Sequence, residues 1–155
     1  MDTIDKKALK EFVLEASRAT YASGNESIKQ KQSDSSTTIE FKKGPFAYHD
    51  NYFGGEPYGG REVVFFNNKP VWMMVYYGYV FSGVKAEEVY PFLIESLSHS
   101  SLDMPYRGPT LFEREGWVYQ NDFVGDVDMF SGVEKILKDD VCVYEASYIG
   151  GLINE

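Results

Sequence analysis

Residues 44–80 read GPFAYHDNYFGGEPYGGREVVFFNNKPVWMMVYYGYV, and this stretch decides the fold class. Residues 71–81 are β-branched and aromatic, a composition that suits a well-covered strand. Residues 62–66 (EVVFF) have the same character. The Asn67-Asn68 dipeptide lies between the two runs, and asparagine tolerates the left-handed backbone of a tight turn. The pattern therefore predicts a β-hairpin.

The same stretch contains a glycine-rich segment, FGGEPYGG, at residues 53–60. Glycine makes positive backbone dihedrals available, so we expect a loop here. No dinucleotide fingerprint, Walker lysine or following helix accompanies these glycines, and the segment does not indicate a phosphate site. Pro45 cannot donate a backbone hydrogen bond, which predicts that it opens a strand over residues 46–52.

Two further segments have helical periodicity. Residues 4–20 predict an amphipathic helix, which Asp2, Thr3 or Asp5 could cap. Residues 85–99 predict a second helix, which Pro91 kinks or starts.

Residues 22–36 are polar and predict a long mobile loop. Further strands are expected at residues 37–42, 111–114, 117–124, 133–137 and 141–149.

The chain also resembles itself. Sliding residues 39–81 onto 111–153 without a gap aligns seven identical pairs. This predicts that a helix-plus-four-strand unit occurs twice, at about residues 4–81 and 85–153, within a single domain of residues 1–155. The expected fold class is α+β, a mainly antiparallel sheet with two covering helices. The identical pairs are Gly44/Gly116, Asp50/Asp122, Gly60/Gly132, Glu62/Glu134, Val71/Val143, Tyr76/Tyr148 and Gly78/Gly150.

Composition narrows the function classes. The chain has 24 acidic and 15 basic side chains and a net charge of −9, which disfavours nucleic-acid binding by this chain alone. No apolar run approaches the about 20 residues of a membrane span, and the N-terminus has no apolar signal core. A cytoplasmic protein is therefore expected. The single Cys142 excludes an internal disulfide, and His49 and His99 lack ligand spacing, so no metal or cofactor is expected.

Several landmarks together resemble one uncharacterised bacterial family. The family is a domain of unknown function that occurs alone or behind a Cro/repressor-type helix-turn-helix. Val75 stands where that family usually has asparagine. The resemblance implies a sensing or regulatory domain and names no catalyst. The landmarks are YAxG (21–24), YHDNYFGG (48–55), PVWMMVYYG (70–78), PYRGP (105–109) and YIGGLI (148–153).

Four carboxylates are secondary site candidates, because the repeat places them in two equivalent pairs. The pairs are Asp50 with Glu62 and Asp122 with Glu134. Two facing carboxylates could perform acid–base chemistry or bind a hard cation. The alternative is that the aspartates cap turns while the glutamates face solvent, and the absence of a calcium-loop pattern favours this alternative.

Aromatic side chains with a polar group are the main site candidates. Trp72 and Tyr76 share one strand face by parity, and Tyr144 and Tyr148 are their repeat counterparts. With Arg107 they could line a pocket between the two copies, for a ligand with a planar apolar part and an anionic group. An ordinary aromatic core is the competing reading. The wider set of polar aromatics is Tyr48, Tyr52, Trp72, Tyr76, Trp117, Tyr119, Tyr144 and Tyr148.

Three functional hypotheses follow. The first is a non-enzymatic module that binds a small organic ligand, in a regulatory role. The second is a small enzyme that uses carboxylates and tyrosines in a cleft. The third is a protein-interaction domain, such as a homodimer formed through sheet edges or aromatic patches.

Overall fold

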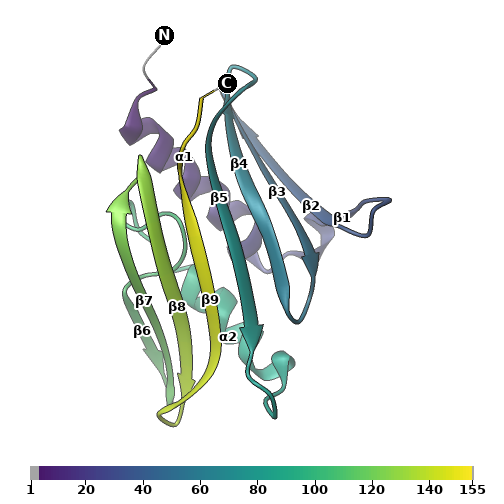
Figure 1. Cartoon of the computed structure of the whole chain (residues 1–155), viewed down its shortest axis with the longest axis vertical. Helices are drawn as coiled ribbons and strands as arrows, with labels where there is room; N and C mark the ends of the chain where they lie inside the picture. Colours follow the sequence, from purple (N-terminus) through teal and green to yellow (C-terminus); the bar gives the residue numbers. More distant parts are fainter. Residues whose placement is uncertain (1–3, 155) are drawn as a thin grey trace.

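The computed structural model describes residues 4–154, which form one nine-stranded antiparallel sheet and two α-helices on one of its faces (Figure 1). The expected fold class is confirmed at this level. The strand order is β1-β2-β3-β4-β5-β9-β8-β7-β6. The strands are β1 (Gln30–Lys31), β2 (Thr37–Lys43), β3 (Phe46–Gly54), β4 (Tyr58–Phe66), β5 (Lys69–Val80), β6 (Leu111–Arg114), β7 (Trp117–Asp126), β8 (Met129–Lys138) and β9 (Val141–Leu152).

The two helices form where apolar spacing predicted them. Helix α1 (Lys6–Ala19) begins after Asp5, whose carboxylate accepts the backbone N–H groups of Lys7 and Ala8. Helix α2 (Ala86–Leu97) contains Pro91 in its interior, so this proline neither starts nor ends the helix. Each helix buries one side, which is mainly apolar. The buried residues are Leu9, Phe12, Val13, Ala16 and Ser17 in α1, and Val89, Phe92, Leu93, Ser96 and Leu97 in α2.

The centre of the sheet joins two segments that are far apart in sequence. Strands β5 and β9 pair antiparallel, with Tyr76 directly opposite Tyr148. Strands β1–β4 extend the sheet beyond β5, and strands β6–β8 extend it beyond β9 (Figure 1). The expected hairpin between β4 and β5 is confirmed, and Asn67 and Asn68 have the positive φ values of 48° and 65° that its turn requires. The internal duplication stays a prediction.

The glycine-rich segment differs from the expectation of a loop. Strand β3 extends to Gly54 and β4 begins at Tyr58, so most of residues 53–60 are paired in the sheet. Gly54 has a positive φ of 81° at the turn, whereas Gly59 and Gly60 serve close packing between strands. A Cβ atom on Gly60 would lie 2.5 Å from the Cβ of Tyr52 on the neighbouring strand, so a side chain at this position would displace that tyrosine.

The segment 22–36 contains short regular elements, and its expected mobility stays a prediction. It contains parts of two single-turn 3₁₀ helices, η1 (Tyr21–Ser23) and η2 (Glu26–Ile28), and strand β1 pairs with β2 at the sheet edge. Polar caps explain the turns, because the Asn25 side chain accepts the backbone N–H of Ser27.

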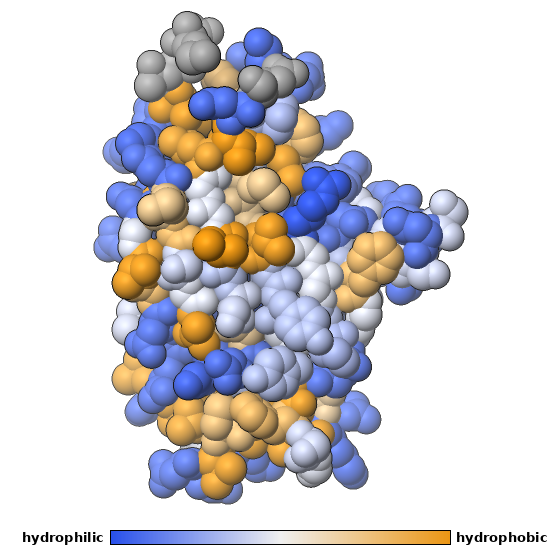
Figure 2. Space-filling model, viewed as in Figure 1, coloured by the Kyte–Doolittle hydropathy of each residue, from blue (hydrophilic) through white to orange (hydrophobic). Residues whose placement is uncertain are grey.

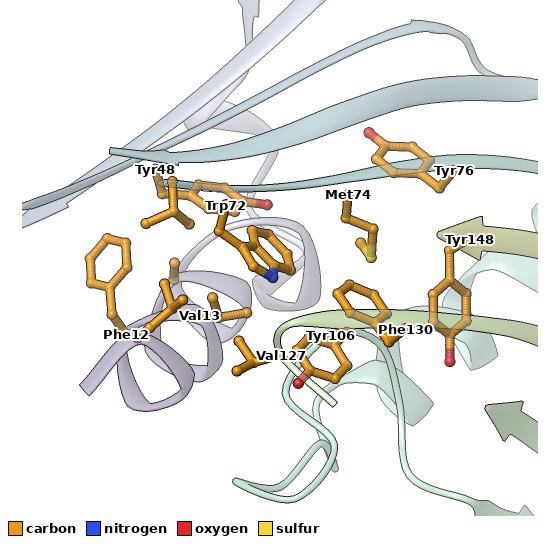
Figure 3. Packing of buried hydrophobic residues seen from close by; sticks show 13 residues of the cluster. Phe12, Val13, Tyr48, Trp72, Met74, Tyr76, Tyr106, Val127, Phe130 and Tyr148 are labelled. Atoms are coloured by element: carbon orange, nitrogen blue, oxygen red, sulfur yellow. The ribbon is translucent and has the colours of Figure 1, made fainter. Parts of the chain in front are cut away.

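The apolar core lies between the helices and the sheet. Trp72 is fully buried and stacks on Phe130 and Tyr106, with ring centroids 5.7 and 6.1 Å away. Figure 3 shows these rings beside Val13 of α1. A second cluster packs α2 against β7, β8 and β9, and Tyr144 belongs to it. Burial of these side chains fixes which face of the sheet the helices cover.

Candidate functional site

A group of charged and phenolic side chains is buried among the apolar residues on the helix-covered face of the sheet. We call it the polar core. Alternate strand residues share a face, which brings the members from β3, β4, β5, β7, β8 and β9 to the same side. The polar core consists of Tyr48, Asp50, Tyr58, Glu62, Tyr76, Arg107, Tyr119, Glu134 and Tyr144.

Asp50 and Glu62 form the first half of the polar core. They are direct cross-strand partners on β3 and β4, and only 3% and 1% of their surfaces are exposed. The Tyr76 hydroxyl donates to Asp50 Oδ1, and the Tyr48 hydroxyl donates to Glu62 Oε1, both at 2.5 Å. Each carboxyl group is therefore held by one phenol.

The other oxygen of each carboxyl group is free. Within residues 4–154, Asp50 Oδ2 and Glu62 Oε2 have no hydrogen-bond partner. The only fully sealed side-chain polar atoms without a partner in this range are Trp72 Nε1 and Ser100 Oγ. The two carboxyl oxygens are therefore not fully sealed from solvent, although their side chains are deeply buried.

Burial changes the protonation of this pair. Loss of hydration raises the pKa of Asp50 to about 6, although the hydrogen bond from Tyr76 and the charge of Arg107 oppose the rise. Burial, and then the neighbouring Asp50 charge, raise the pKa of Glu62 to about 8. Two adjacent carboxyl groups titrate as a unit, so near neutral pH the pair holds about one proton.

Arg107 and Glu134 form the second half of the polar core. Arg107 comes from the connector between α2 and β6, and its Nε and Nη2 both donate to the Glu134 carboxylate, Nε at 3.2 Å. The two side chains are 6% and 0% exposed. A buried pair of this kind needs its remaining hydrogen bonds satisfied. Glu134 thus takes the place beside Arg107 that an anionic ligand was expected to take.

Phenols complete the contacts of Glu134. Tyr119 and Tyr144 donate to its two oxygens at 2.5 and 2.9 Å. The Tyr58 hydroxyl shares a hydrogen bond with Tyr144 and lies 3.5 Å from Arg107 Nη2. Tyr58 reaches this position because Gly78 has no side chain, since a Cβ atom there would lie 2.7 Å from the Tyr58 hydroxyl oxygen.

The segment after α1 lies beside the first half of the polar core. Tyr21 donates to the backbone carbonyl of Tyr106 at 3.0 Å, and the Arg107 guanidinium lies 5.5 Å from the Tyr21 ring centroid. The Lys29 ammonium lies 6.0 Å from the Tyr52 ring centroid. Residues 21–29 therefore cover a part of the site that neither α1 nor α2 covers.

The five predicted ligand-binding residues are divided by the structure. Arg107, Tyr76 and Tyr144 belong to the polar core. Trp72 lies in the apolar cluster, and Tyr148 donates to Asn121 at 2.6 Å. Tyr76 and Tyr148, which lie opposite each other at the centre of the sheet, therefore bond different residues, Asp50 and Asn121.

Of the secondary candidates, Asp50, Glu62 and Glu134 belong to the polar core, whereas Asp122 lies outside it. Asp122 is exposed on the opposite face of the sheet, and Asn121 is the buried cross-strand partner of Glu134. The gap-free alignment misplaces β7 by one residue, and a one-residue slip moves every side chain to the other face.

Sequence reasoning missed Tyr58 and Tyr21. Tyr58 was assigned to a glycine-rich loop, and Tyr21 to the start of a polar segment. Strand parity offers the one usable signal, because Tyr58, Gly60 and Glu62 alternate along β4 and share its helix-covered face.

The uncovered face of the sheet, opposite the helices, carries two shallow hollows. Figure 2 shows this face, with apolar side chains across its middle between polar ones. The larger hollow, about 750 Å³, is lined by β5, β7, β8 and β9, and includes the exposed side chains of Val75, Tyr77 and Ile149. The smaller, about 300 Å³, is lined by β2, β3 and β4. Trp72, Tyr144 and Arg107 line neither of them.

Within residues 4–154, no group of three or more His, Cys, Asp and Glu side chains could hold a metal ion. No helix in the described part of the chain has the length and apolar character to cross a membrane.

Comparison with known proteins places the chain in a family. The model of the domain of unknown function DUF5680 matches residues 50–153, which include every member of the polar core except Tyr48. No curated protein and no solved structure matches the chain. The match covers more than half of the sequence, and the chain therefore belongs to the DUF5680 family.

Proposed function

We propose that this protein is a non-enzymatic module that binds a small organic molecule in the first half of its polar core, against Asp50 and Glu62. One observation carries the proposal. Two almost fully buried carboxyl groups each leave one oxygen without a partner, at a place lined by tyrosines. A fold without a ligand gains nothing from burying such groups, because desolvation of a carboxylate is costly unless it is fully hydrogen-bonded.

The protonation of the pair supports the proposal. Shifted pKa values in carboxyl groups that are packed together are typical of functional sites. Structural ion pairs shift pKa values too, and the Arg107–Glu134 pair is of that kind. Asp50 and Glu62 differ, because neither forms a salt bridge within residues 4–154.

The route by which the ligand enters is inferred from the segment that covers the site, residues 21–29. Residues 21–29 are joined to the site through Tyr21 and Lys29, and two single-turn helices separated by Gly24 bury little apolar surface. Segments with few buried contacts open at low free-energy cost. We therefore assign ligand entry to the displacement of residues 21–29 rather than to movement of the sheet.

Thermal unfolding in the presence of small-molecule fractions of a cell extract tests the proposal. At least one fraction should raise the Tm of the wild-type chain and have no effect on Asp50→Asn and Glu62→Gln. The matched control is Asp122→Asn, which removes an exposed carboxylate from the opposite face and should respond like the wild type. Equal responses of Asp50→Asn and Asp122→Asn would place any site elsewhere.

Acid–base catalysis at the same pair is a second candidate. It is favoured by the different pKa values of the two carboxyl groups, about 6 and about 8, since such a difference assigns one group as base and the other as acid. Incubation of the protein with a ligand identified above, followed by mass spectrometry, distinguishes the two. Turnover that is lost in Asp50→Asn and in Glu62→Gln would indicate an enzyme.

We also propose that the fold arose by internal duplication of a helix-plus-four-strand unit. The β-bulges support this, because they fall between Val64 and Phe65 in one half and between Ile136 and Leu137 in the other. The turns support it too, since Asp139 and Asp140 repeat the φ values of Asn67 and Asn68. Two similar units that meet at β5 and β9 create a junction, and junctions of this kind are common ligand sites.

The cellular role is a regulatory one in this proposal. A cytoplasmic sensing domain of this kind would act through a partner such as a helix-turn-helix protein. Co-purification from cells, with and without the ligand, tests this role, and a ligand-dependent change of partners would support it.

A further inference from the structure

The charges of the polar core do not balance, and the imbalance points to the kind of ligand. Arg107 is the one cation whose guanidinium lies inside this cluster, and Glu134 engages it through two donors. Asp50 and Glu62 therefore share no cation of their own. Full ionisation of the three carboxyl groups would leave the cluster with a net charge of −2, so this buried site takes up either a proton or a counter-ion.

The surroundings of Asp50 and Glu62 are those that an organic cation prefers. The rings of Tyr48 and Tyr76 are fixed beside the pair by their hydroxyl groups. Aromatic faces attract cations through the ring quadrupole, and the attraction is stronger where water is excluded. The Arg107 guanidinium itself lies 5.9 Å from the Tyr76 ring centroid and 5.5 Å from that of Tyr21.

The chain already places one ammonium group near this pair. Lys29 follows η2, its Nζ lies 6.0 Å from the centroid of Tyr52, and it bonds Glu26 Oε1 at 2.9 Å. Its charge acts on Asp50 and lowers the pKa of that carboxyl group. A primary ammonium on the covering segment thus lies close enough to act on Asp50 while it bonds Glu26 rather than the pair.

We infer that the ligand of the polar core is a small organic amine, bound as an ammonium ion between the free oxygens of Asp50 and Glu62. The inference rests on the proposed function and names its ligand class. The ammonium donates to Asp50 Oδ2 and Glu62 Oε2, and the tyrosine rings contact its carbon atoms. Lys29 moves away with residues 21–29 as the amine enters.

Binding of the ammonium is coupled to loss of a proton. At neutral pH the pair holds about one proton, which passes to the solvent when a cation takes its place. The other titratable and charged groups that face the pair are Tyr48 on β3, Tyr76 on β5, Tyr21 on η1, Lys29 after η2 and Arg107 on the connector. The tyrosines have raised pKa values and stay neutral in this range.

The test uses 1-aminobutane and 1,4-diaminobutane as probes, with 1,4-butanediol and butyrate as neutral and anionic controls of similar size. Isothermal titration of the full chain should detect binding of an amine and not of the diol or butyrate. Affinity should rise with pH from 6 to 8, by up to about tenfold per unit for one released proton. Titration in two buffers of different ionisation enthalpy should detect that proton.

Variants separate this inference from the function on which it rests. Asp50→Asn and Glu62→Gln should each weaken amine binding by at least about tenfold and abolish its pH dependence. Asp122→Asn should bind like the wild type, and Lys29→Met should bind more tightly because a competing ammonium is gone. Binding of the diol or butyrate at the same residues would overturn the amine assignment and leave the ligand-binding function standing. If neither 1-aminobutane nor 1,4-diaminobutane binds, the amine assignment is overturned as well. If no extract fraction raises the Tm, the ligand-binding function itself is overturned.

Discussion

Asp50 and Glu62 lie directly opposite each other on neighbouring strands β3 and β4, both almost fully buried and neither in a salt bridge within residues 4–154. Like charges opposite each other in a sheet are destabilising. The pair is therefore a cost to the fold that packing elsewhere offsets, and its presence is best explained by use.

Stability should fall as pH rises. The pKa values of Asp50 and Glu62 are raised from 3.8 and 4.5 to about 6 and about 8, so the folded state binds more protons than the unfolded chain between about pH 4 and pH 8. The free energy of unfolding in urea should therefore decrease from pH 5 to pH 8, by roughly 2–5 kcal/mol. Glu62→Gln should lose most of this dependence, and the exposed Glu113→Gln should keep it. An identical pH profile for Glu62→Gln and the wild type would contradict the raised pKa.

The fold was predictable from the sequence as far as local chemistry determined it. The aromatic runs around Asn67 and Asn68 predicted the hairpin, and apolar spacing predicted both helices. Glycine misled, because the sequence does not reveal whether a glycine is there for a turn or for close packing. At Gly60 close packing is the reason for glycine, and only the position of Tyr52 on the neighbouring strand reveals it.

The candidate site was predictable in its residue types and not in its grouping. Arg107, Glu134 and Glu62 were singled out from the sequence, and Asp50 lies opposite Glu62 as the repeat paired them, whereas Glu134 lies opposite Asn121 rather than Asp122. The exchange of Asn121 for Asp122 depends on one residue of register in β7, which the gap-free alignment cannot detect. Trp72, like the tyrosines, is an aromatic residue with a polar group on a strand, but it stacks in the apolar core. Its position on β5 alone does not reveal this.

Breaking the second half of the polar core should destabilise the protein strongly. Glu134→Ala leaves the Arg107 guanidinium buried without a carboxylate and removes the acceptor of Tyr119 and Tyr144. We expect a loss of about 3–5 kcal/mol in the free energy of unfolding. Glu113→Ala is the control and should change stability by less than about 0.5 kcal/mol. A small effect of Glu134→Ala would mean that Arg107 is not buried as described.

Gly78 should tolerate no side chain. A Cβ atom at this position would lie 2.7 Å from the Tyr58 hydroxyl oxygen and 2.9 Å from the Cβ of Ala146. Gly78→Ala should therefore displace Tyr58 and cost about 1–3 kcal/mol in chemical denaturation. At Gly55 a Cβ atom would meet nothing within 4 Å, so Gly55→Ala should be nearly neutral. Equal stability of the two variants would show that Tyr58 does not fill the space beside Gly78.

The covering segment should open before the sheet does. Residues 23–29 are exposed except for the half-buried Ile28, whereas β5 and β9 form the centre of the sheet. Hydrogen exchange should be at least about tenfold faster at the backbone amides of residues 22–29 than at those of β5 and β9. A bound ligand should slow exchange in this segment most. Equal protection of the segment and the central strands would contradict the proposed route of entry.

Native mass spectrometry of the chain purified under non-denaturing conditions tests the central claim most directly. We predict that the wild-type chain and Asp122→Asn carry the same additional small mass, that the mass is released by gentle activation, and that Asp50→Asn and Glu62→Gln lack it. The identity of the released molecule then shows whether it is an amine. A bound mass that persists in Asp50→Asn and Glu62→Gln, or wild-type protein that gains no mass from any cell-extract fraction, would contradict the account.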